Sequence, residues 1–105
     1  MKMSLCRSFL HARALPGKRA ELVQAFTGRR VLQECREAVP GCLGGELLLS
    51  ASEPDALCVT VLWASPADHH AWLASPVRVA QGPALAAWLA SADAPVLMPV
   101  ATALD

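Results

Sequence analysis

Eight prolines, most of them beside a glycine, a serine or an acidic residue, divide the 105-residue chain into short segments. Proline fixes φ and lacks a backbone N–H, so it ends helices and is confined to the ends or edges of strands. A length of about 100 residues also rarely divides into two units with separate cores. We therefore predict a single compact domain over residues 1–105, built from short helices and strands.

Four segments have the composition of β-strands. Residues 3–14 end at Pro16-Gly17, and residues 42–52 and 56–64 form a hairpin around Glu53-Pro54-Asp55. The stretch 57–63 is rich in apolar and β-branched residues, which predicts an interior strand. Residues 96–104 form a further β-like run, and its proline restricts it to an edge or a bulge.

Helical patterns occupy the intervening segments. Residues 18–39 carry two apolar stripes about 180° apart at 3.6 residues per turn, so we predict a kink or break at Thr27-Gly28. Ser65 before Pro66 is a good N-cap for a helix that ends near residue 73 or 74, where Ser75-Pro76 interrupts it. A last helical stretch is predicted over 84–91, after Gly82-Pro83. The resulting order is βαββαβ, an α+β fold of the ferredoxin-like split-βαβ type with helices on one face of an antiparallel sheet.

Composition and charge argue against several classes of function. Eight of the nine basic residues lie at or before Arg36 and seven of the nine acidic residues follow it, although the net charge is zero. A nucleic-acid-binding arm brings denser basic clusters or stacking aromatics, so a solvated helix face is the preferred interpretation. The chain contains no asparagine or tyrosine, which removes both groups from any catalytic site.

The cysteines do not indicate a metal site or a disulfide framework. Cys6, Cys35, Cys42 and Cys58 form no C-x-x-C pair and lack a histidine at zinc-finger spacing. The first residues do not form a signal peptide, and no apolar run approaches the length of a membrane span. We expect a cytoplasmic protein with no metal and no membrane partner, whose thiols are small core hydrophobes.

Three motifs together resemble the antibiotic biosynthesis monooxygenase (ABM) domain family. They are Pro16-Gly17-Lys18-Arg19-Ala20-Glu21-Leu22, the run from Val39-Pro40-Gly41 to Leu47, and Val61-Leu62-Trp63-Ala64-Ser65 followed by Ala71-Trp72-Leu73-Ala74-Ser75-Pro76. The match covers residues 5 to about 80. The resemblance implies a dimeric α+β barrel, in which two copies pack their open sheet faces together. It also implies an enzyme that oxidises an aromatic, polyketide-like or quinol small molecule with O2 and without a cofactor.

The resemblance and the residue types suggest a set of site residues. Trp63 matches the family tryptophan that lines the cavity, although it also fits a core aromatic. His69 and His70 differ by about 100° around a helix, so at most one faces inward as a catalytic base, and both fit a solvated surface. His11 is a further candidate for the substrate site.

Arg78 is the only basic residue after Arg36, so it is a candidate for binding an anionic substrate; a surface pair with Asp68 or Asp93 is the alternative. Trp72 is a candidate substrate contact, and its helical spacing also fits packing.

Two departures from the family pattern keep a second function open. Relatives that modify polyketides use an asparagine and a tyrosine, and the haem-degrading branch uses an asparagine and a proximal histidine where this chain has Trp72 and Leu73. Haem binding is therefore not expected. The leading hypothesis is a cofactor-independent monooxygenase with His70 or His69 as base. The alternative is a non-oxidative ligand-binding or cyclase-like dimer.

Overall fold

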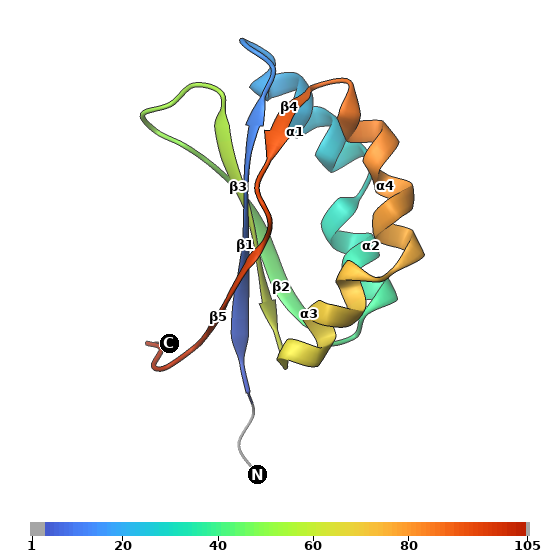
Figure 1. Cartoon of the computed structure of the whole chain (residues 1–105), viewed down its shortest axis with the longest axis vertical. Coiled ribbons are helices and arrows are strands. Elements are labelled where there is room, and N and C mark those ends of the chain that lie inside the picture. The colour runs from blue at the N-terminus through green and yellow to red at the C-terminus, as the bar shows by residue number, and fades with distance from the viewer. Residues whose placement is uncertain (1–3, 105) are drawn as a thin grey trace.

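The computed structural model describes residues 4–104 as one antiparallel sheet with helices on one face, as Figure 1 shows. This confirms the predicted ferredoxin-like α+β class. The elements, in chain order, are β1 (Cys6–Ala14), α1 (Arg19–Gly28), α2 (Val31–Ala38), β2 (Cys42–Leu49), β3 (Ala56–Trp63), α3 (Pro66–Leu73), α4 (Pro76–Ala86), β4 (Leu89–Ala92) and β5 (Val96–Pro99). The described part of the chain contains no helix long and apolar enough to cross a membrane.

The sheet has the order β2-β3-β1, and β4 and β5 share the remaining edge of β1. β4 pairs with the C-terminal end of β1, and β5 pairs with its N-terminal half. The predicted strand over 96–104 is therefore shorter, ending at Pro99. β3 lies between β2 and β1 along its whole length, which confirms the interior strand inferred from its β-branched composition.

Local sequence signals account for the start of α3. Ser65 is extended, and its hydroxyl oxygen accepts a hydrogen bond from the Asp68 backbone N–H while its O–H donates to the Asp68 carboxylate at 2.8 Å. Gly41 lies against the same carboxylate, where no Cβ would fit. The predicted cap is confirmed, and it also joins the turn before β2 to α3.

The long helical segment is broken, as its two apolar stripes predict. α1 ends at Gly28 and α2 begins at Val31, with Arg30 in the left-handed region at φ 58°. The break lies just after the expected Thr27-Gly28 position. It allows Leu22 and Phe26 of α1 and Cys35 of α2 all to be buried, although a straight helix would point them to different sides.

The predicted helix over residues 84–91 is wrong. α4 begins at Pro76, with Ser75 as its cap, and runs through Gly82-Pro83 to Ala86, whereas residues 89–92 form β4. Pro83 has no N–H to donate to the Val79 carbonyl, its helical partner four residues earlier. Both residues are exposed, so water can donate to that carbonyl instead. Leu85, Trp88 and Leu89 do share a surface: they pack on the buried cluster of Ala14, Leu22 and Leu57. Their spacing indicated a common face correctly but not a continuous helix.

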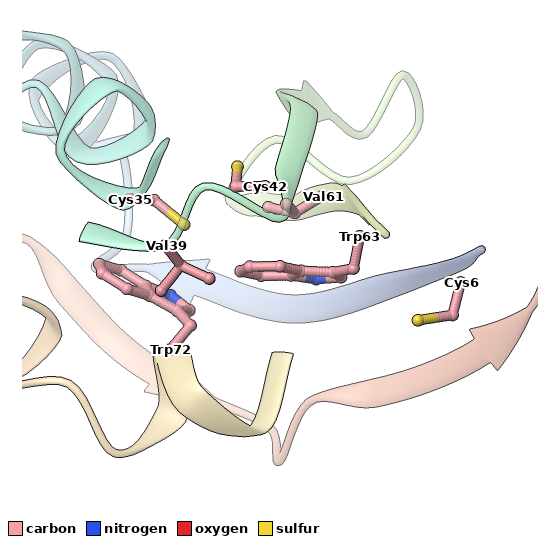
Figure 2. Close-up of a cluster of buried hydrophobic side chains, with 7 residues drawn as sticks. All are labelled: Cys6, Cys35, Val39, Cys42, Val61, Trp63 and Trp72. Carbon is pink, nitrogen blue, oxygen red and sulfur yellow. The ribbon is translucent and has the colours of Figure 1, made fainter. Parts of the chain in front are cut away.

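The larger core cluster lies between the sheet and the helices, as Figure 2 shows. Its members come from β1, α2, the turn after α2, β2, β3 and α3, and they are Cys6, Cys35, Val39, Cys42, Val61, Trp63 and Trp72. All four cysteines are free, and three of them are buried; Cys58 is half-buried. Burial raises the pKa of the Cys6 thiol, which is consistent with a packing role.

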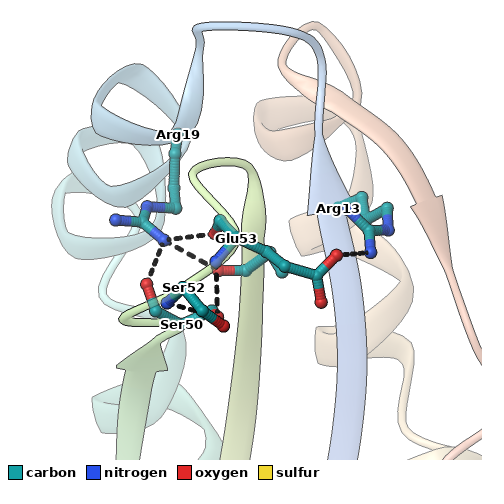
Figure 3. Close-up of polar contacts among 6 residues, drawn as sticks. Arg13, Arg19, Ser50, Ser52 and Glu53 are labelled. Carbon is teal, nitrogen blue, oxygen red and sulfur yellow. Dashed lines mark hydrogen bonds and ion pairs between the residues drawn. The ribbon is translucent and has the colours of Figure 1, made fainter.

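The loop between β2 and β3 is held by one arginine from α1. Arg19 Nη1 lies 2.9 to 3.1 Å from the backbone oxygens of Ser50, Glu53 and Ala56. Figure 3 shows Arg19 beside Ser50 and Glu53 of this loop. The neighbouring ion pair between Arg13 and Glu53 is exposed. Arg19 therefore adds a charged donor to the turn, where the Ala56 and Glu53 carbonyls also accept the backbone N–H groups of Ser50 and Ala56. Arg13 contributes only a solvated contact.

We expect Arg19→Ala to lower the free energy of unfolding by about 2 kcal/mol, because hydrogen bonds from a charged donor to the three carbonyls are lost. Urea denaturation measures this change. Arg13→Ala is the matched control, and its effect should stay below about 1 kcal/mol because its ion pair is exposed. Equal losses in the two variants would contradict this role for Arg19.

Candidate functional site

A cavity of about 590 Å³ lies between the helix-facing side of the sheet and the helices. Its wall is mostly apolar, with side chains from β1, β2, β3, α1, α2, α3, α4 and β4. Three lining residues carry a charged or amide side chain: Arg78, Gln81 and Asp93. A largely apolar cavity with a few polar groups is the usual form of a small-molecule site.

Strand and helix periodicity together produce this wall. Leu10 and Ala12 on β1 and Val59 on β3 point to the helix side because alternate residues of a strand share a face. On α4, Arg78 and Gln81 are one turn apart and therefore lie on the same side of the helix. The cavity therefore has a polar strip along α4 opposite an apolar sheet.

Arg78 is half-buried and borders this cavity. Within residues 4–104 it forms no ion pair with an acidic residue, so the alternative of a surface pair with Asp68 or Asp93 is wrong. A guanidinium is a donor only and stays charged at any physiological pH. It can therefore bind a carbonyl, phenolate or carboxylate oxygen of a ligand.

Trp63 is fully buried, in the core cluster beside the cavity, and it is not among the residues that line the cavity wall. Its indole Nε1 donates to the Ser8 hydroxyl at 2.9 Å. Trp72, from the same cluster, does line the cavity. Of the two tryptophans, Trp72 is thus the one placed to touch a ligand, and Trp63 supports the cluster behind it.

The three histidines have different surroundings. His69 is only 7% exposed, and its ring centroid lies 5.5 Å from that of Trp63 at an interplanar angle of 55°. His70 is exposed on α3. His11 is exposed on β1 and alternates with Leu10 and Ala12, so it faces away from the helices. The structure thus brings His69, Trp63 and Trp72 together and places His70 and His11 outside this group.

The environment of His69 favours its neutral form. Burial, and secondarily the charges of Arg78 and His70, hold the pKa of His69 below its ordinary value near 6.5. The imidazole is therefore neutral at pH 7 and can accept a proton.

Gln81 was not among the predicted site residues. It is 3% exposed, and its amide nitrogen donates to the Val31 carbonyl at 3.2 Å and to the Glu34 carboxylate at 3.1 Å. The sequence held one usable signal: Gln81 lies three residues after Arg78, on the same face of a helix. That signal requires the correct helix boundaries, which the Gly82-Pro83 pair obscured.

The described residues offer no ready metal centre. Residues 4–104 contain no group of three or more His, Cys, Asp or Glu side chains arranged to hold an ion.

A sequence comparison identifies the family of this chain. The model of the antibiotic biosynthesis monooxygenases matches residues 10–80. The chain belongs to this family. No curated protein sequence matches it.

Solved structures of ABM-type proteins have the same fold. A candidate antibiotic biosynthesis monooxygenase from Chloroflexus aurantiacus is 25% identical, with a TM-score of 0.71, and the match covers 97% of this chain and 98% of that one. SnoaB, a cofactor-independent oxygenase from Streptomyces nogalater, is 17% identical, with a TM-score of 0.77 and coverage of 96% and 97%. A Nitrosomonas europaea protein of unknown function is 21% identical, with a TM-score of 0.75 and coverage of 97% and 94%. The last two likenesses establish the fold alone.

The lowered pKa of His69 predicts that this ABM protein loses stability in acid. Below about pH 6.5 the unfolded chain binds a proton at this residue that the folded chain does not, so unfolding becomes more favourable as the pH falls. Urea denaturation between pH 7.5 and 5 measures the effect. His69→Gln should reduce the pH dependence, whereas His70→Gln, the exposed neighbour, should leave it in place. An unchanged slope in His69→Gln would show that this histidine is not the group responsible.

Proposed function

We propose that this ABM protein is a cofactor-independent monooxygenase that oxidises a small phenolic or quinol-like aromatic with O2. The observation that carries the proposal is the apolar cavity bordered by Arg78, in a chain that belongs to the antibiotic biosynthesis monooxygenase family. In the proposed reaction one oxygen atom becomes a carbonyl on the aromatic skeleton. The other leaves as water with two hydrogens of the substrate, one from the hydroxyl group and one from the oxidised carbon. The whole chain acts as one ABM domain.

The proposed roles follow from what each group can donate or accept. Arg78 stabilises the phenolate that forms when the substrate loses its proton, since a cation is most effective in a site from which water is excluded. Trp72 forms part of the apolar wall. His69 is the base: it is buried, its lowered pKa keeps it neutral, and it precedes the cavity residue Trp72 by one turn of α3. A bridging water carries the proton to it, because His69 itself is not part of the cavity wall.

We also propose a homodimer formed through the open face of the sheet. That face presents three rows of side chains across the strands: Leu48, Cys58 and His11; Glu46, Thr60, Phe9 and Val96; and Gly44, Leu62, Arg7 and Met98. Leu48, Val96 and Met98 are between 44% and 55% exposed. A second copy would cover these apolar side chains, and a closed two-sheet assembly is what the resemblance to the family implies. The free cysteines support a reducing compartment such as the cytoplasm.

A non-oxidative role, as a ligand-binding or cyclase-like dimer, is the second candidate. Two observations favour it: the chain has no asparagine or tyrosine, and none of the three histidines is among the residues that line the cavity. Such a protein would bind the same aromatic ligands and consume no oxygen. Oxygen uptake therefore separates the two functions.

The oxygenase proposal predicts oxygen uptake with anthrone and phenolic naphthacenone substrates, measured with an oxygen electrode and by product analysis under air and under nitrogen. His69→Gln should lower the rate about 100-fold, the contribution typical of a general base. His70→Gln is the matched control and should retain the rate. Absence of any oxygen-dependent product with these substrates would contradict the oxygenase and leave the ligand-binding alternative.

The dimer proposal predicts a particle of twice 11.1 kDa by light scattering. Leu48→Lys combined with Met98→Lys should give a monomer, because two charges would have to be buried on an apolar face. Val79→Lys is the control: Val79 is the more exposed at 71% but lies on α4, in the helix layer. Dissociation in the control, or a dimer that survives both lysines on the open face, would argue for a different interface.

A further inference from the structure

Gln81 places a buried amide in the apolar wall of the cavity. The side chain is 97% buried, as its 3% exposure shows, and a buried amide is costly unless its polar atoms find partners. It lies on α4, on the side that faces the sheet and the cavity. Hydrophobic packing alone gives no reason for an amide at this position.

The orientation of that amide is fixed by its partners. Its nitrogen donates both hydrogens, one to the Val31 carbonyl oxygen and one to the Glu34 carboxylate. Both partners are acceptors, so a flipped amide would set oxygen against oxygen at each contact. Glu34 is itself held by Arg29 at 2.5 Å, and the hydrogen bond from Gln81 and that from Arg29 lower its pKa. The Gln81 nitrogen therefore faces α2, and its oxygen faces elsewhere.

The Gln81 oxygen has no protein partner and is not completely enclosed. Within residues 4–104 this oxygen accepts no hydrogen bond from protein. In the same part of the chain, every side-chain nitrogen or oxygen that is completely buried has a hydrogen-bond partner. The oxygen is therefore not sealed by protein atoms. The space that Gln81 borders is the cavity.

We propose that Gln81 is a specificity-determining residue that accepts a hydrogen bond from a hydroxyl group of the substrate. The inference rests on the proposed use of the cavity as the substrate site. A carbonyl oxygen held in this way selects an O–H donor over an ether, which would leave it unpaired. Arg78, one turn earlier on α4, has only donors and selects an acceptor oxygen. The matching substrate class is an aromatic with a hydroxyl and a carbonyl or phenolate oxygen along one edge.

Calorimetric titration under nitrogen with 2-naphthol and 2-methoxynaphthalene tests the inference, because the two probes differ only at the hydroxyl. We expect the wild type to bind 2-naphthol about tenfold more tightly, the ratio that one net hydrogen bond supplies. Gln81→Met retains the size of the side chain and should remove this preference by weakening 2-naphthol alone. Gln24→Met, at an exposed glutamine of α1, is the matched control and should retain it.

A measurement on the wild type alone covers the case in which Gln81→Met does not fold. Neutral 2-naphthols of rising acidity, substituted at the far ring, should bind more tightly as the hydroxyl becomes a better donor. Equal affinity for naphthol and ether, a preference that survives in Gln81→Met, or a flat acidity series would each overturn the inference. So would a failure of either probe to bind. Oxygen uptake with anthrone is independent of these titrations, so it shows whether the proposed function stands when the role of Gln81 fails.

Discussion

The alternation of side chains along β1 and β3 is the constraint on which the rest of the structure depends. It sends Cys6, Val61 and Trp63 toward the helices and leaves Phe9, Cys58 and Leu62 on the opposite face. Each face is then available for a separate task, because strand neighbours never share one. The helix side forms the core and the cavity. The open side leaves the apolar side chains of Leu48, Val96 and Met98 exposed.

The break between α1 and α2 makes the cavity wall possible. A left-handed residue such as Arg30 costs about 1 kcal/mol, and a straight helix would avoid that cost. The break lets Leu22, Phe26 and Val31 all face the sheet side and line the cavity. The Val31 carbonyl, at the first residue of α2, also accepts a hydrogen bond from Gln81. The start of α2 thus contributes both to the apolar wall and to the orientation of the buried amide in it.

Signals confined to a few neighbouring residues could be read from the sequence, and this explains which predictions held. The cap at Ser65, the hairpin and the interior strand β3 each depend on local chemistry, and all three are present. The prediction of a helix over 84–91 is wrong because it treats Gly82-Pro83 as a boundary between two helices. Such a pair ends a helix only where water cannot replace the lost hydrogen bond, and the exposure of a residue is not visible in a sequence. The direction of the His69 side chain depends on the phase of its helix. The burial of Gln81 depends on contact with α2, which lies over forty residues away in the sequence.

The lack of asparagine and tyrosine leaves charge as the main means of stabilising an anion in this cavity. In the proposed reaction a phenol gives its proton to His69, so a neutral pair becomes an anion and an imidazolium, and separating such charges in an apolar site is expensive. Arg78 reduces that cost at the anion but opposes the imidazolium, as its effect on the pKa of His69 shows. The balance favours transfer only if the anion lies closer to Arg78 than His69 does. A phenol held on α4, beside Arg78 and within reach of Gln81, meets that condition, because both groups belong to the same face of one helix.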